Sequence, residues 1–152
     1  MVDNLNFQRA GSLSNAHVGR DFEYLAQNLL FNEGIMVYPN FPLELGVGLI
    51  KKKHAFDLGC AESKIIVECK SHKWTSGDKV PSAKLTVWNE AMYYFHLAPS
   101  EYRKIMFVLH DVSKKRGLSI ADYYQDKYNH LIPEDVESWE VNEITQTFKI
   151  TK

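Results

Sequence analysis

Two apolar segments joined by a short turn, in the stretch HAFDLGCAESKIIVECK, constrain the fold of this chain more than any other feature. Their β-branched residues and the short connection between them predict an antiparallel β-hairpin. Residues 65–67 are all apolar, which is typical of a strand buried on both faces. Asp57, Glu68 and Lys70 need an explanation in that setting, because buried charges require partners.

The register of the hairpin decides where these charges lie. If residues 61–64 form the turn, Asp57 lies directly across from Glu68, and both side chains are on the same face. Lys70 shares that face, since it follows Glu68 by two residues. A shift of one residue would move Asp57 to the opposite face.

Two facing carboxylates repel each other unless a proton or a cation lies between them. A divalent cation is the simplest partner, and hard oxygen ligands favour Mg²⁺, with Mn²⁺ expected to substitute. Lys70 would then orient or deprotonate a nearby water, or stabilise charge on a phosphoryl group. The alternative is a solvated strand face, with a weak ion pair between Glu68 and Lys70 and with Asp57 shaping the strand end.

The rest of the chain predicts a mixed α/β fold. Three segments have apolar residues at helical spacing and predict helices: residues 15–33, 82–97 and 118–131. Strands are expected in five segments: residues 35–50, 51–60, 64–70, 104–112 and 138–151. This order predicts a central mixed β-sheet flanked by helices, of the α+β kind, with an αβββαβ core.

Length and composition favour a single domain over residues 1–152, in which residues 1–14 are expected to form a poorly ordered or loosely packed N-terminal segment. No segment has the roughly 20 consecutive apolar residues that cross a bilayer, and the N-terminus lacks a signal-peptide pattern. We therefore expect a cytoplasmic protein without a membrane partner. The two cysteines indicate neither a disulfide framework nor a zinc site.

The net charge of −1 argues against strong nonspecific attraction to nucleic acid, but the charge is unevenly distributed. Residues 51–84 hold eight basic and four acidic residues, so positive charge gathers around the hairpin. The candidate substrate contacts are basic or aromatic: Lys51, Lys52, Lys53, Lys73, Trp74 and Lys84. For Trp74 the alternatives are stacking on a base or sugar and closing the core. The lysine run at 51–53 could contact phosphates, but a short charge run is more often a solvated loop.

The hairpin resembles the PD-(D/E)XK nuclease superfamily, which has the restriction-endonuclease-like fold. In that superfamily an Asp is followed, after a short turn, by an apolar strand ending in Glu-x-Lys. Here the motif reads FDLG and IIVECK, with Phe56 where the superfamily often has proline. The segment GRDFEYLAQNLL resembles the superfamily's first helix, and Glu23 matches the glutamate that points toward the site. The αβββαβ order also agrees.

This resemblance implies a Mg²⁺-dependent endonuclease, a phosphodiesterase with DNA as the expected substrate. Asp57, Glu68 and the backbone carbonyl of Cys69 would ligate Mg²⁺. Lys70 would assist the attacking water, and Glu23 would contribute through a second metal or a water.

Two alternatives stay open. The chain could be a catalytically inactive, nuclease-like module that binds nucleic acid or protein, which the near-neutral charge favours. It could also be half of a homodimer, because cutting both strands of a duplex favours two sites. The interface would then hold residues 138–151 or the aromatic pair Tyr123 and Tyr124.

Overall fold

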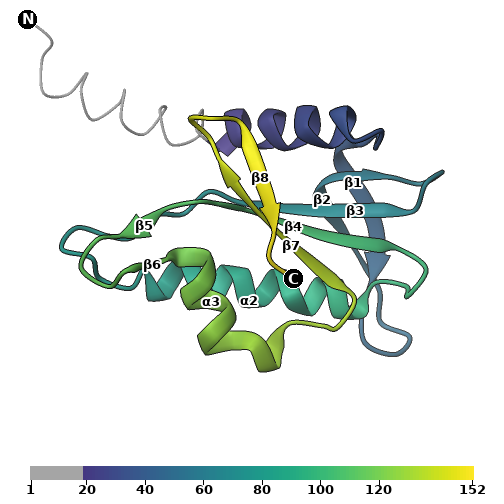
Figure 1. Cartoon of the computed structure of the whole chain (residues 1–152). Helices are drawn as coiled ribbons and strands as arrows, with labels where there is room; N and C mark the ends of the chain where they lie inside the picture. Colours follow the sequence, from purple (N-terminus) through teal and green to yellow (C-terminus); the bar gives the residue numbers. More distant parts are fainter. Residues whose placement is uncertain (1–18) are drawn as a thin grey trace, which may run out of the picture.

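Six strands form one mixed sheet, and helices cover both of its faces (Figure 1). The structure is a computed structural model that describes residues 19–152. The predicted N-terminal segment, residues 1–14, and the predicted start of the first helix, residues 15–18, lie outside the described residues. The mixed α/β fold is confirmed.

The first helix covers residues 19–32 of the described chain. The strands of the main sheet are β1 (Tyr38–Leu45), β2 (Lys52–Cys60), β3 (Ile65–Lys70), β4 (Arg103–Leu109), β7 (Val136–Asn142) and β8 (Thr147–Ile150). The other elements are α2 (Ser82–Leu97), the short pair β5 (Val112–Ser113) and β6 (Leu118–Ser119), α3 (Ile120–Tyr128) and the 3₁₀ helix η1 (Asn129–Leu131). The predicted αβββαβ order is therefore present. The predicted helix at residues 118–131 is shorter than expected, because β6 takes its first two residues and a 3₁₀ turn its last three.

The strand order in the main sheet is β1-β2-β3-β4-β7-β8. The central strands β3, β4 and β7 are parallel, and the outer pairs are antiparallel. Strands buried on both faces explain why β3 and β4 are almost continuously apolar. The carboxyl ends of the three parallel strands meet at one edge of the sheet, where ligands commonly bind in folds of this kind.

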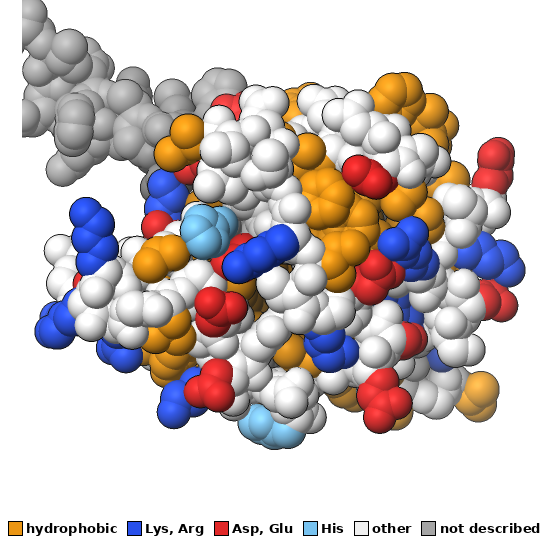
Figure 2. Space-filling view, viewed as in Figure 1, with side chains coloured by type: hydrophobic (Ala, Val, Ile, Leu, Met, Phe, Trp, Pro, Cys, Tyr) orange, Lys and Arg blue, Asp and Glu red, His pale blue; other side chains and the backbone are white. Residues whose placement is uncertain are grey.

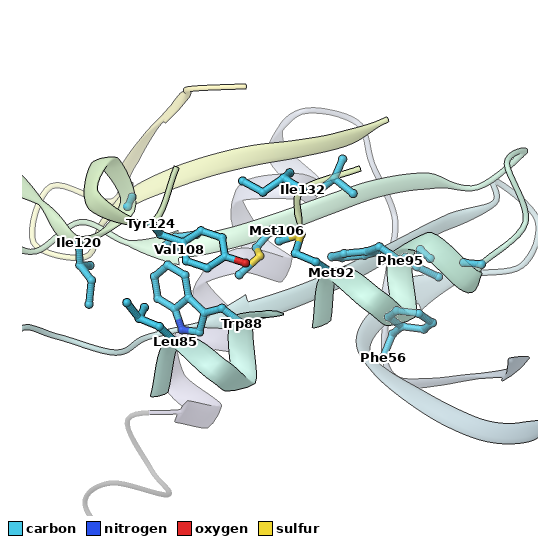
Figure 3. Close-up of a cluster of buried hydrophobic side chains, with 14 of the residues drawn as sticks. Phe56, Leu85, Trp88, Met92, Phe95, Met106, Val108, Ile120, Tyr124 and Ile132 are labelled. Carbon is cyan, nitrogen blue, oxygen red and sulfur yellow. The ribbon is translucent and has the colours of Figure 1, made fainter. Parts of the chain in front are cut away.

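Each face of the sheet has its own apolar core. The core under α2 contains the helix stripe predicted from the sequence: Leu85, Trp88, Ala91, Met92 and Phe95, all buried. Figure 3 shows the ring of Trp88 beside that of Tyr124, and their centroids are 4.9 Å apart. The opposite core is built on the first helix, whose Phe22, Ala26 and Leu30 are buried against the sheet.

The buried side chains of strand β2 switch from one face of the sheet to the other in the middle of the strand. Phe56 lies in the core with α2, whereas Leu58 lies in the core with the first helix. Residues two apart share a face in a regular strand, so the strand bends or twists sharply at Asp57. The ladder between β1 and β2 is interrupted at the same level, where Asn40 has a φ of 54°. This irregularity places Asp57 at a break in the sheet.

Candidate active site

The predicted hairpin register is confirmed. Residues 61–64 form the turn, and Leu58 pairs with Val67 as that register requires. The ladder ends at this pair, because β2 bends at the next residue. Asp57 and Glu68 therefore do not form the expected ladder pair but stand at a fork where β2 and β3 separate.

The carboxylate of Asp57 lies between β2 and β3 at this fork. Its Oδ2 accepts a hydrogen bond from the backbone N–H of Cys69 over 2.7 Å. If the ladder continued, Phe56 would lie opposite Cys69, and the backbone of β2 would supply a partner for the Cys69 N–H. The side chain of Asp57 takes the place of that backbone partner. The bond holds Asp57 against the carboxyl end of β3.

Glu68 and Lys70 share a face of β3, as the sequence predicts. The Nζ atom of Lys70 lies 3.5 Å from Oε2 of Glu68. The other oxygen, Oε1, lies 2.9 Å from Nε2 of His54, whose ring stacks on Tyr94 of α2 with 3.7 Å between centroids. Glu68 is only 5% exposed, and these two partners offset the cost of burying its charge.

A cavity of about 690 Å³ opens at the carboxyl end of β3. The first helix contributes Glu23 to its lining, and β2 contributes Asp57. Three basic residues also line it, Lys70, Lys73 and Lys84, the last from α2. The first helix and α2 cover opposite faces of the sheet, so the cavity has an acidic side, where Glu23 lies, and a basic side, where Lys84 lies.

Burial and crowding raise the pKa of both carboxyl groups that line the cavity. Burial, and then the nearby charge of Glu68, raise the pKa of Asp57 to about 7, against the opposing hydrogen bond from Cys69. The same two causes, in the same order, raise the pKa of Glu23. A proton or a cation relieves such crowding.

The chemistry of the donor groups fits a hard divalent cation. Within residues 19–152, no group of three or more His, Cys, Asp or Glu side chains is arranged to hold a metal ion. The contacts of Glu68 with His54 and Lys70 give a reason, since both carboxylate oxygens already have partners. Mg²⁺ needs only one or two carboxylates when water and phosphate oxygens complete its shell. A Mg²⁺ ion could therefore be held by Asp57 and a carbonyl such as that of Cys69, together with Glu68 if one of its carboxylate oxygens gave up its present partner.

Trp74 does not line the cavity. Its indole N–H donates to the carbonyl of Asp111 over 3.1 Å, and its ring packs against the core under α2. The guanidinium of Arg116 lies over the ring, 5.2 Å from its centroid, and Tyr123 meets it edge-on. These contacts correspond to the alternative expectation for Trp74, in which it closes the core.

The lysine run at 51–53 does not line the cavity either. All three side chains are exposed where the β1–β2 hairpin turns, and Lys51 donates to the carbonyl of Gly46 over 3.1 Å. Three apolar side chains are also exposed at this hairpin tip: Val47, Leu49 and Ile50.

Two histidines belong to this region although no sequence motif singled them out. His54 contacts Glu68, and His72 lines the cavity. Strand periodicity offered a signal for His54, because it precedes the buried Phe56 by two residues and shares its face. His72 lies in the loop after β3, where no periodic pattern applies.

Comparisons with protein-family models, curated proteins and solved structures find no match to this chain. Among the described helices, none has the length and apolar character needed to cross a bilayer. The likeness to PD-(D/E)XK nucleases accordingly stays a prediction that rests on the motif residues and their placement at the fork.

Proposed function

We propose that this protein is a metal-dependent nuclease that hydrolyses phosphodiester bonds of DNA, as the PD-(D/E)XK resemblance implies. One observation carries the proposal: Asp57 is held at the fork between β2 and β3, in a cavity shared with Glu23 and Lys70 and adjacent to Glu68. The motif residues come from two strands and a helix, yet they converge on one edge of the sheet.

Asp57, Glu68 and the Cys69 carbonyl are the groups that would hold Mg²⁺. When bound, Mg²⁺ would offset the charge of phosphate oxygens and lower the pKa of a coordinated water. The ammonium of Lys70 would orient the attacking water or stabilise the charge that develops on the phosphoryl oxygens. Glu23 would hold a second metal or a water on the acidic side.

The basic side of the cavity supports an anionic polymer as substrate. Lys70, Lys73 and Lys84 supply positive charge beside the carboxylates, which is where a phosphate backbone would need it. On the face drawn in Figure 2, basic and acidic side chains are interspersed. Binding would therefore depend on the local lysines of the cavity, in keeping with the net charge of −1.

The direct test is cleavage of supercoiled, linear and branched DNA in Mg²⁺ or Mn²⁺. Wild-type protein should cut at least one substrate, whereas Asp57→Ala and Glu68→Ala should leave all of them intact. Asp126→Ala is a matched control, because Asp126 is an exposed carboxylate on α3. If wild type and Asp57→Ala leave every substrate equally intact, the nuclease proposal fails.

A binding module without turnover is the second candidate. Two features favour it: both carboxylate oxygens of Glu68 already have partners, His54 and Lys70, and the β1–β2 tip exposes apolar side chains next to lysines. Calorimetric titration of Mg²⁺, with and without DNA, separates the two candidates. DNA binding without measurable binding of a divalent ion would favour the module.

A homodimer is the form we propose for double-strand cleavage, because each strand needs its own site. The chain mass is 17.6 kDa, so sedimentation distinguishes monomer from dimer directly. A monomer that persists in the presence of DNA would exclude this arrangement.

A further inference from the structure

The hydrogen bonding of His72 is determined by a buried tryptophan. The indole N–H of Trp88 donates to Nδ1 of His72 over 2.7 Å. An indole nitrogen can only donate, so Nδ1 must accept and carry no proton. The neutral imidazole therefore carries its proton on Nε2.

Trp88 is held too firmly to release this bond easily. It is fully buried in the core under α2 and packs on Tyr124 (Figure 3). Burial, and then the charges of Lys70 and Lys84, lower the pKa of His72 to about 4. His72 thus stays neutral near pH 7, with one nitrogen committed to the core.

The other nitrogen is available to the cavity. The two ring nitrogens of histidine point in different directions, and His72 lines the cavity while its Nδ1 faces Trp88. Among the residues that the structure describes, no hydrogen-bond partner is found for Nε2. A donor without a protein partner beside a solvent-open cavity is suited to a ligand that accepts hydrogen bonds.

The lysines nearby indicate what that ligand is. Lys70 and Lys73 lie near carboxylates, those of Glu68 and Glu143, each at 3.5 Å. Lys84 makes no ion pair within residues 19–152. Its ammonium and the N–H of His72 are both donors, and together they match the oxygens of a phosphate group.

We propose that Nε2–H of His72 and the ammonium of Lys84 form a phosphate-binding subsite for the DNA backbone, next to the carboxylate side of the cavity. This inference rests on the proposed function for the identity of the polymer. A neutral donor has a specific advantage here, since it binds an anion without adding positive charge that would compete with a cation at Asp57. His72 is a binding residue in this scheme and takes no part in proton transfer.

Nuclear magnetic resonance of the full chain labelled at histidine nitrogen tests the first step, in a chelator so that no cleavage occurs. The expected spectrum has the His72 proton on Nε2, and addition of a short DNA duplex shifts that signal. A proton on Nδ1, or a His72 signal that DNA leaves unchanged, would overturn the proposal.

Affinity measurements test the second step in the same metal-free buffer. Loss of one hydrogen bond to a phosphate in His72→Phe should weaken duplex binding by about three- to tenfold. His72→Gln keeps a neutral amide donor and should recover part of the loss. His96→Phe is the matched control, because His96 is exposed on α2 and lines a different cavity. Equal affinity of wild type and His72→Phe would contradict the subsite.

These outcomes separate the subsite from the nuclease proposal. Binding that depends on His72, in a protein that cuts no DNA, would retain the subsite and reject the nuclease. Efficient cleavage with an unchanged KM in His72→Phe would retain the nuclease and reject the subsite. Thermal unfolding of each variant identifies any loss that comes from misfolding, since Trp88 loses its acceptor in His72→Phe.

Discussion

The carboxylate of Asp57 accepts a hydrogen bond of 2.7 Å from the backbone N–H of Cys69, at the point where β2 separates from β3. The bend that frees Asp57 from the ladder thus also turns its side chain onto the end of the neighbouring strand. Any movement of β3 at Cys69 will move the carboxylate as well. The fork and the candidate site are consequently one structural unit.

Substitutions of Asp57 should separate the structural and chemical roles of this bond. Asp57→Asn keeps an acceptor for the Cys69 N–H, whereas Asp57→Ala leaves that donor unpaired and should cost about 1–3 kcal/mol of stability. Cleavage should be lost in both variants, because neither has a carboxylate at this position. Urea unfolding and a cleavage assay measure the two effects. An active Asp57→Asn would refute a ligand role for the carboxylate.

The ionisation of Asp57 should make the metal-free protein less stable as pH rises from 3.8 to about 7. Its pKa is raised across this interval by burial and by Glu68, so the folded protein keeps a proton that the unfolded chain has released. The lowered pKa of His72 acts in the opposite direction between about pH 4 and 6.5, where the unfolded chain binds a proton that the folded protein does not. The difference in slope between wild type and Asp57→Asn, from urea unfolding in chelator, therefore isolates the contribution of Asp57. Identical slopes would contradict the raised pKa.

His54 should stabilise the metal-free state through Glu68. In His54→Phe the buried carboxylate keeps only Lys70 as a partner, and the loss should be about 1–3 kcal/mol. Added Mg²⁺ should restore part of that stability if Glu68 is a ligand. A double-mutant cycle with Glu68→Gln measures the coupling, and additive effects of the two substitutions would show that the 2.9 Å contact contributes nothing.

Trp74→Phe should weaken the fold and leave DNA affinity unchanged. The substitution removes the indole hydrogen bond to the carbonyl of Asp111 and reduces the surface beneath Arg116, for a loss of about 0.5–1.5 kcal/mol. Denaturant unfolding and fluorescence anisotropy with labelled DNA provide the two readouts. Reduced affinity with unchanged stability would instead assign Trp74 to the substrate.

Lys84→Ala should reduce DNA affinity and lower the dependence of binding on salt by about one unit of slope. The control is Lys127→Ala, an exposed lysine on α3. A combined Lys51→Ala, Lys52→Ala and Lys53→Ala variant asks whether the hairpin tip also contacts phosphates. A loss in that variant but not in Lys84→Ala would move the binding surface from the cavity to the tip.

Local patterns were sufficient for much of the fold. The four-residue turn and the period of two predict the hairpin register, and the apolar stripe predicts α2 with the bounds observed, Ser82–Leu97. The irregular course of β2 was not predictable, because alternation assumes a regular strand. The position of the bend depends on tertiary packing, because Phe56 packs in the core on one face of the sheet and Leu58 packs in the core on the other.

The candidate site divides in the same way. The sequence by itself indicated the charged residues Asp57, Glu68 and Lys70, and it determined that Glu68 and Lys70 share a face of β3, because a strand repeats every two residues. Only the tertiary structure decided which partners they meet, since His54 reaches Glu68 and Trp88 orients His72 across separate elements. Contacts of that kind depend on how the sheet, the first helix and α2 pack together, and no local periodicity encodes them.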